Sequence, residues 1–494
     1  MTQPQNMSES NKFIRDIIWV AISQIFTNLL SFITLPALTK TYTTEIFGVY
    51  TQVLVTVGFL APIITLQFVT AMVRFLAGEE DKDKRLRSIG AMLYTVIIFA
   101  CVILAIGNIW ASQISFYIFG DSAYNLIVRL AFFLACANAI YLFLISYLRA
   151  RGKIKRLSII QIALFTSRMG CIVGLVLSGF SLQWVIVGMM CVYLIFILYL
   201  LFNIIREVGF PVPNFSGLSG FLAFSVPQIP TGILTWIMSV SDRYFITHFI
   251  DLSQTGIYAS SSTLAGLISL FYFPIGYVLL PVVSRTWEQN KKAETKVYFE
   301  YSTRLFLTLA IPGAVGLSML SQTLLVVLTT PEYLAGITLV LLIAISQIFE
   351  GMFQLNTYIV YLVKQTKWLP LMIVTSTGIS IGLNVALIPY IGIVGAAISK
   401  IVAYFLLAII VTIWANKALN YEINLGYIAK IICASMVMAV CLYFLNIGGI
   451  IGFVISVITG LTVFVILMIL MKAFTQQDRQ LLKNAINTFL PWKQ

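Results

Sequence analysis

The chain has 494 residues, of which 60% are hydrophobic and only 10% are charged, and its net charge is +13. A soluble protein would carry about 25% charged residues, so this composition excludes a soluble multidomain protein and indicates an integral membrane protein. The basic residues lie in short connections beside apolar stretches. Topology and anionic headgroups account for them there, so their number does not indicate a nucleic-acid partner.

Apolar stretches of membrane-spanning length follow one another along most of the chain. Because hydrocarbon cannot hydrogen-bond a free backbone, each stretch must form a helix. The pattern predicts an all-α, polytopic protein with 14 spans, at residues 16–38, 48–72, 89–110, 125–147, 157–178, 182–204, 219–240, 256–282, 303–328, 336–362, 369–389, 393–415, 428–446 and 449–471.

The positive charges alternate between the two sides of these spans. Of the 31 Lys and Arg residues, the connections on one side hold only Lys40, and four more fall inside spans. Basic connections remain on the cytoplasmic side of a membrane. We therefore expect a multi-pass protein of the cell membrane with both termini in the cytoplasm.

An internal repeat divides the chain. Phe47-Gly48-Val49-Tyr50 opens the second span, and Thr255-Gly256-Ile257-Tyr258 opens the eighth, 208 residues later. Each unit then holds six spans, an even number, so both units have the same orientation. Parallel repeats predict two six-helix lobes related by a pseudo-twofold axis along the membrane normal, with a substrate site between them.

The repeat also sets the expected domain boundaries. We expect an N-terminal lobe at residues 1–206, a C-terminal lobe at 207–418, and two extra spans with a cytoplasmic tail at 419–494.

A cation inside a bilayer is costly and marks a functional position. The intramembrane cations Arg129, Arg168, Arg243 and Lys400, together with Arg74 at an inner mouth, are therefore the candidate substrate-binding residues. Structural readings stay open: Arg243 could snorkel outward with its neighbour, and Lys400 could snorkel from its position after a turn.

Two carboxylates are candidates for ion coupling. Asp242 and Arg243 are adjacent on a helix and so do not face each other, which leaves Asp242 to bind another cation, such as Arg129. Glu350 lies near the middle of the tenth span, where a carboxylate either exchanges protons or pairs with an arginine.

The sequence contains no combination of residues typical of an enzyme active site. The chain has a single His and no Gly-rich phosphate loop, and its six Cys lie in apolar runs without the spacing of metal ligands. We expect no cofactor, no metal and no catalytic site. Transport would then be driven by gradients or by the substrate itself.

Two sets of residues resemble a known family. One is Pro227, Trp236 and Asp242-Arg243-Tyr244-Phe245-Ile246, followed by Gly256-Ile257-Tyr258; the other is Asn384-Val385-Ala386-Leu387-Ile388-Pro389, Gly392-Ile393-Val394-Gly395-Ala396-Ala397 and Tyr404. Both are similar to the polysaccharide (Wzx-type) flippases of the multidrug/oligosaccharidyl-lipid/polysaccharide exporter superfamily.

The resemblance implies a V of two six-helix lobes that works by alternating access. It implies export of isoprenoid-diphosphate-linked oligosaccharide from the inner to the outer leaflet. The implied partners are that lipid-linked oligosaccharide, the bilayer and a polysaccharide polymerase machinery.

Three alternatives remain. Multidrug or organic-cation antiporters of the superfamily usually have twelve spans and an acidic residue in an early helix, which this chain lacks. Lipid II flippases share the fourteen spans but carry more arginines in their first, second and eighth helices, where this chain has only Arg15 and Arg74. A membrane polysaccharide polymerase generally needs a sizeable outer loop, and the outer connections here are short.

Overall fold

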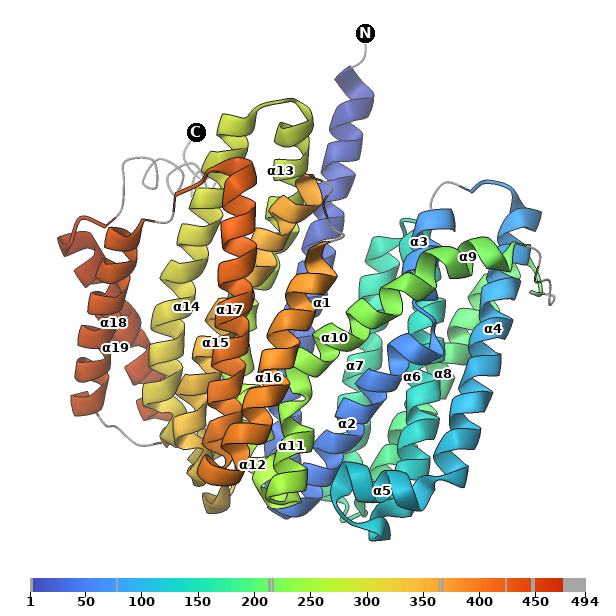
Figure 1. Cartoon of the computed structure of the whole chain (residues 1–494), viewed down its shortest axis with the longest axis horizontal. Helices are drawn as coiled ribbons and strands as arrows, with labels where there is room; N and C mark the ends of the chain where they lie inside the picture. Colours follow the sequence, from blue (N-terminus) through green and yellow to red (C-terminus); the bar gives the residue numbers. More distant parts are fainter. Residues whose placement is uncertain are drawn as a thin grey trace.

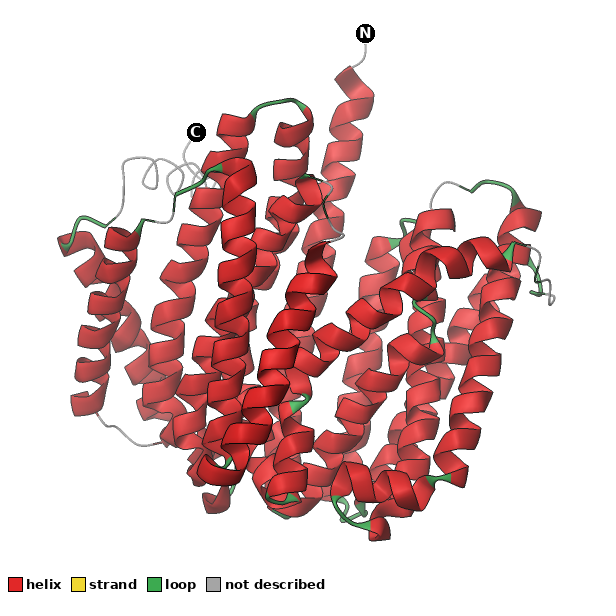
Figure 2. Cartoon of the chain, viewed as in Figure 1, coloured by secondary structure: helices red, strands yellow, loops and turns green. Residues whose placement is uncertain are grey.

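The computed structural model describes residues 3–76, 79–211, 215, 217–363, 365, 368–422, 424–445 and 449–473. These residues form helices and loops without a strand (Figure 2). Within them, 14 helical segments are long and apolar enough to cross a membrane, at the positions predicted from the sequence. The predicted all-α, polytopic fold is thus confirmed. The side chain of Arg15 and the predicted tail at 474–494 lie outside the described part.

The first repeat unit holds eight α-helices. They are α1 (Gln3–Thr41), α2 (Thr44–Ile64), α3 (Phe68–Leu76), α4 (Lys82–Ile109), α5 (Ala111–Phe119), α6 (Asn125–Ala150), α7 (Ile154–Leu177) and α8 (Leu182–Val208). The short helix α5 joins two spans at one end of the molecule, and α2 and α3 together make the second span.

The second unit is more often interrupted. Its helices are α9 (Leu218–Ser225), α10 (Ile229–Val240), α11 (Asp242–Phe249), α12 (Leu252–Ala265), α13 (Ser269–Glu288), α14 (Lys292–Leu328), α15 (Ile337–Leu362), α16 (Leu369–Ile391) and α17 (Ile393–Leu419). Short 3-10 turns with Pro227 and Gly266 separate α9 from α10 and α12 from α13. Two further helices, α18 (Leu425–Leu445) and α19 (Gly449–Leu470), complete the chain.

The helix contacts of the two units are duplicates of each other. Helix α6 packs on α2 and α8, and α7 packs on α8; in the second unit α15 packs on α12 and α17, and α16 packs on α17. The first span of each unit crosses to the other unit: α1 contacts α13 and α14, and α9 contacts α3 and α4. This duplication confirms two similar six-span units, whose first spans contact the other unit and also pack within their own, α1 on α7 and α10 on α16. The exact domain boundaries stay a prediction.

The two units contact each other at the repeated glycines, Gly48 on α2 and Gly256 on α12. A Cβ atom on Gly48 would lie 2.0 Å from the carbonyl oxygen of Leu252, and one on Gly256 would lie 2.3 Å from that of Thr44. Each pair of partners is related by the 208-residue offset, so α2 and α12 cross on the pseudo-twofold axis. The hydroxyls of Thr44 and Ser253 add a hydrogen bond across this contact. Small residues allow such close backbone approach between membrane helices.

The lobes converge at one end of the molecule and diverge at the other. Figure 1 shows α2, α11 and α12 gathered at the end that also carries α5, and the helices spreading apart toward the opposite end. Helices α18 and α19 lie outside the repeat and pack on α14. The arrangement has the V shape expected from the sequence.

The glycine crossing generates a stability prediction. Gly48→Ala and Gly256→Ala each force backbone against backbone, and we expect each to destabilise the protein by about 1–3 kcal/mol, as overpacking does. The melting temperature of the purified protein in detergent should fall for both. Gly378→Ala on α16 is the matched control, because nothing lies within 4 Å of its added methyl. Equal melting temperatures for all three variants would contradict the close crossing.

Candidate functional site

A cavity of about 500 Å³ lies between the lobes, and we call it the central cavity. Its size falls within the range of ligand sites, about 300–1,000 Å³. It is lined by Gly58, Ala61, Pro62, Thr65, Gln67, Val69, Leu142, Gly232, Thr235, Trp236, Met238, Ser239, Glu350, Phe353, Gln354, Ile373, Tyr404 and Leu407. Helices α2 and α6 of the first unit thus face α10, α15, α16 and α17 of the second.

The second span breaks beside this cavity. Helix α2 ends at Ile64, and Leu66 and Gln67 have φ angles of 48° and 56°. A left-handed backbone is uncommon for residues other than glycine, and such strain gathers at functional sites. The break places Gln67 in the cavity lining, against Gly232 of α10.

A smaller cavity of about 220 Å³ lies between α1, α2, α7, α11 and α12, and we call it the arginine cavity. It is lined by Thr27, Leu30, Ser31, Thr34, Leu35, Leu38, Phe47, Tyr50, Thr51, Leu54, Phe165, Arg168, Met169, Ile172, Arg243, Ala259 and Thr263. Two arginines from different lobes therefore face one space that also presents several hydroxyls. This combination can bind an anion that carries hydroxyl or phosphate oxygens.

Arg168 is held by aromatic neighbours. Its Nη1 donates to the hydroxyl of Tyr193 at 2.9 Å, and its guanidinium lies 5.6 Å from the ring centres of Phe165 and Tyr193. Its buried Nε has no hydrogen-bond partner among the described residues. A buried donor without a partner is costly, and an anion in the cavity would supply the acceptor.

Asp242 and Lys400 form a buried ion pair beside the central cavity. The Lys400 ammonium lies 3.1 Å from Oδ2 of Asp242 and donates to the carbonyl of Ser239 at 2.6 Å. The same Oδ2 accepts from the hydroxyl of Tyr258 at 2.5 Å, and Oδ1 accepts from the backbone N–H of Arg243 at 3.0 Å. The hydrogen bond from Lys400 depends on the break between α10 and α11, because the Arg243 N–H there donates to Asp242 and the Ser239 carbonyl accepts from Lys400.

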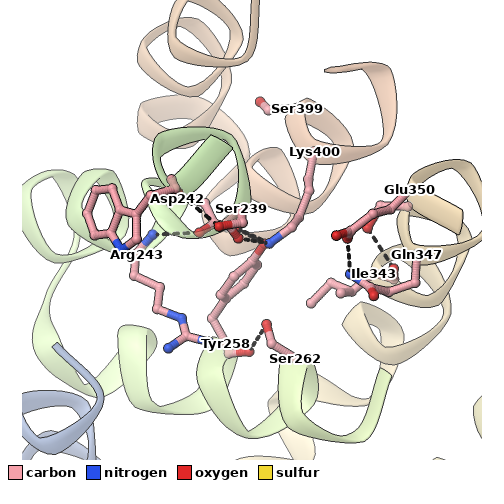
Figure 3. Close-up of polar contacts among 12 residues, drawn as sticks. Ser239, Asp242, Arg243, Tyr258, Ser262, Ile343, Gln347, Glu350, Ser399 and Lys400 are labelled. Atoms are coloured by element: carbon pink, nitrogen blue, oxygen red, sulfur yellow. Dashed lines mark hydrogen bonds and ion pairs between the residues drawn. The ribbon is translucent and has the colours of Figure 1, made fainter. Parts of the chain in front are cut away.

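The Arg243 side chain turns away from this pair. Figure 3 shows its guanidinium pointing away from Asp242 and Lys400, consistent with its place in the lining of the arginine cavity. The expectation that Asp242 and Arg243 face different partners is met. The partner of Asp242 is Lys400, however, and not Arg129.

Glu350 lies on the other side of Lys400 from Asp242 (Figure 3). Its Oε2 accepts from Nε2 of Gln347 at 3.0 Å, and it interacts with the hydroxyls of Tyr272 and Tyr404 and with the charge of Lys400. Glu350 is also among the residues that line the central cavity. Two carboxylates thus flank one ammonium, and Lys400 forms its ion pair with Asp242.

The other predicted binding residues lie elsewhere. Arg129 is exposed, in the first turns of α6, and lines neither cavity. Arg74 is exposed near the end of α3, with its guanidinium 4.2 Å from the ring centre of Phe224. Of the five basic candidates, the structure brings Arg168 and Arg243 together and buries Lys400 in an ion pair.

Sequence reasoning missed the polar lining of the central cavity. Gln67, Thr235 and Gln354 are neutral and carry no signal as strong as an intramembrane charge. An amide inside an apolar run, as at Gln67, was the available hint. The break of the second span was also missed, because no Gly or Pro lies in the turn at Thr65–Gln67.

A third hollow, which we call the side groove, lies on the outside of the second unit. It measures about 490 Å³ and is lined mainly by α14, α18 and α19. Its lining is almost entirely apolar, with Arg304, Thr308 and Tyr427 among the few polar residues. The hydroxyls of Thr308 and Tyr427 hydrogen-bond to each other at 2.8 Å.

The buried pair gives a second stability prediction. Removing one partner of a buried ion pair leaves an unpaired charge and costs about 3–5 kcal/mol. We expect Lys400→Met and Asp242→Asn each to lower the melting temperature markedly, and the double variant to recover much of the loss. Lys84→Met is the control, since Lys84 forms an exposed pair with Glu79. Additive losses in the double variant would mean that the two groups are not coupled.

Comparison with solved structures places the fold. The chain superposes on the lipid II flippase MurJ in an inward closed conformation with a TM-score of 0.79 and 13% identity, covering 92% of this chain and 99% of MurJ. An inward-facing multidrug resistance MATE family transporter of the MOP superfamily gives 0.67 and 13% identity, over 82% and 98% of the two chains. These likenesses establish the fold.

Curated relatives come from archaea. A probable flippase of Haloferax volcanii, AglR, is 25% identical over 50% of this chain and 53% of its own length. A probable low-salt glycan biosynthesis flippase of the same organism is 20% identical over 47% and 49%. An uncharacterized membrane protein of Methanocaldococcus jannaschii is 23% identical over 38% and 37%. The chain thus spans about half or less of the relatives it matches.

The family match is broader. The model of the polysaccharide biosynthesis protein family matches residues 13–287, more than half of the chain, and includes both helices of the axial glycine crossing and Arg168, Asp242 and Arg243. The protein is therefore a member of the polysaccharide biosynthesis protein family.

Proposed function

We propose that this flippase-type protein moves an isoprenoid-diphosphate-linked oligosaccharide from the inner to the outer leaflet of the cell membrane by alternating access. Unassisted crossing fails because the sugar hydroxyls and the diphosphate would lose their water without replacement. The protein replaces that water with its own polar groups in a space between the lobes. Probable flippases among the relatives, one named for glycan biosynthesis, support this substrate class.

The observation that carries the proposal is the arginine cavity. Arg168 from the first lobe and Arg243 from the second converge on one space of about 220 Å³ with hydroxyls around it. The planar guanidinium binds phosphate oxygens in pairs. Because the two arginines come from different lobes, a relative movement of the lobes would change the contacts of a diphosphate bound by both.

The side groove suits the lipid part of such a substrate. It is apolar along α14, α18 and α19, and it lies outside the two repeated units, toward the bilayer. Helices α18 and α19 add no charged residue to its lining, while α14 adds Arg304. An isoprenoid chain resting there would stay in an apolar environment while its headgroup crosses.

Orientation and driving force follow from charge. We place the basic connections and both termini in the cytoplasm, so the end where the lobes diverge faces the cytoplasm. A negative charge moving outward gains about 2.3 kcal/mol per 100 mV of membrane potential. The diphosphate is thus pulled in the direction of export, and a polysaccharide polymerase machinery would receive the product outside.

An organic-cation antiporter is the second candidate. The carboxylate of Glu350 in the central cavity is the observation that favours it. The paired arginines disfavour a cation in the neighbouring space, and the family match is to polysaccharide biosynthesis. A lipid II flippase rests on fold similarity alone, and a polymerase has no supporting feature in the described residues.

The arginine cavity can be tested by substitution. We expect Arg168→Ala and Arg243→Ala each to reduce export at least tenfold, because a charge-assisted hydrogen bond contributes about 1.5–3 kcal/mol. Lys at either position should restore part of the rate, since it keeps the charge but not the paired geometry. The measurement is the rate at which a fluorescent polyprenyl-diphosphate glycan changes leaflets in proteoliposomes.

Arg87→Ala is the matched control, because Arg87 is exposed in the first turns of α4. Normal rates for both cavity variants at full reconstitution would rule out the anion site. Organic cations transported by the native protein, with the glycan lipid left behind, would favour the antiporter instead.

Glu350 and Asp242 are proposed as coupling residues, with Glu350 as the group that exchanges protons with the cavity. If inward proton movement drives export, an acidic outer side should speed the native protein. Glu350→Gln cannot exchange a proton, so its rate should be the same with and without the gradient, whatever its absolute value. Transport measured in oriented vesicles under imposed pH gradients checks this. A variant that still responds to the gradient would exclude Glu350 as the coupling group.

A further inference from the structure

The central cavity and the arginine cavity follow the same face of two helices. On α2, the arginine cavity is lined by Tyr50, Thr51 and Leu54, and the central cavity by Gly58 and Ala61. Spacings of three and four residues keep side chains on one face of a helix. The two cavities therefore succeed each other along a single face of α2.

The seventh span repeats this pattern. Gly232, Trp236 and Ser239 line the central cavity, and Arg243 lines the arginine cavity, again at spacings of three and four residues. From Thr51 to Ala61 a helix rises about 15 Å, at about 1.5 Å per residue. One elongated ligand lying along these faces can thus occupy both cavities at once.

The chemistry of the two cavities differs. Among the described residues that line the central cavity there is no Lys, Arg or His, and Glu350 is the one charged group. The other polar groups are amides and hydroxyls, notably Gln67, Thr235 and Gln354, which both donate and accept hydrogen bonds. The aromatic faces of Trp236 and Tyr404 complete a lining typical of a site for an uncharged, hydroxyl-rich molecule.

Lys400, the cation beside the central cavity, is not available to pair with a ligand there. Lys400 is only 8% exposed and is held by Asp242 and by the Ser239 carbonyl. Arg243 points away from Asp242 and Lys400 (Figure 3), and it lines the arginine cavity. An acidic sugar in the central cavity would therefore meet Glu350 without a compensating charge, and it would lose its water without replacement.

We infer that the central cavity holds the glycan while the arginine cavity holds the diphosphate of the same ligand, and that the central cavity selects uncharged or amino-bearing sugars over acidic ones. This inference rests on the proposed function and names its substrate class. An ammonium on a sugar can pair with Glu350, whereas a carboxylate or phosphate on a sugar has no partner there. The selection thus lies in the glycan and leaves the diphosphate site unchanged.

The test compares three fluorescent substrates with the full-length protein in proteoliposomes. They are polyprenyl diphosphate bearing a neutral disaccharide, the same lipid with one hexose replaced by a hexuronic acid, and polyprenyl diphosphate without sugar. The rate at which each becomes accessible to a membrane-impermeant quencher is measured. We expect the neutral glycan to cross at least tenfold faster than both others.

The outcomes separate the two proposals. Equal or faster transport of the uronic acid substrate, or equal transport of the sugar-free lipid, overturns the glycan selection while the flippase function stands. If none of the three lipids is moved by protein that is folded and reconstituted, the proposed function itself fails and the inference fails with it.

A cation added to the cavity gives a second test. Gln354→Arg supplies a positive partner for an acidic sugar. We expect the ratio of the transport rates of the neutral and uronic acid substrates to fall at least threefold relative to the native protein. Gln365→Arg is the matched control, because Gln365 is exposed outside the cavity and should leave the preference unchanged. An unchanged preference in a folded Gln354→Arg protein would mean that the acidic sugar does not enter this cavity.

Discussion

Hydrocarbon cannot solvate a charge or an unpaired backbone group, and the position of every polar feature in this protein follows from that constraint. The spans are helical because their backbone must be satisfied internally. The second and seventh spans are both interrupted. The break in the second span lies beside the central cavity, which Gln67 lines. At the break in the seventh span, the Lys400 ammonium donates a hydrogen bond to the Ser239 carbonyl. At these two breaks, protein groups or a cavity replace the missing backbone partners.

The repeat explains both the symmetry of the framework and the asymmetry of the site. Tyr50 and Tyr258 occupy equivalent positions, 208 residues apart, on the two helices that cross at the axis. Tyr50 interacts with Arg168, while Tyr258 donates to Asp242. Equivalent tyrosines therefore support a cation in one lobe and an anion in the other. The symmetric frame thus places an arginine beside one tyrosine and a buried ion pair beside the other.

Alternating access requires a pivot between the lobes and a ligand that favours one relative position of the lobes over another. The structure offers a candidate for each. The glycine crossing of α2 and α12 brings the backbones of the two lobes close together on the pseudo-twofold axis. The arginines of the proposed diphosphate site come from different repeat units. A ligand held by both lobes favours their approach, while an empty site leaves two like charges facing each other across the cavity. The charge pattern thus links occupancy to the relative position of the lobes.

The sequence by itself determined the number of spans, the expected orientation and the repeat, because these depend on apolar length, on the side that basic residues occupy and on a fixed offset between motifs. It also identified Arg168, Arg243, Asp242 and Glu350, since a charge inside an apolar run is visible without a structure. The tertiary structure alone decided which of these charges meet. Asp242 pairs with Lys400, 158 residues away, and Arg129 is exposed. The amide- and hydroxyl-rich lining of the central cavity forms only when separate helices are brought together. Partner choice depends on helix rotation and on breaks such as the one at Leu66 and Gln67, which local sequence does not encode because packing between helices fixes them.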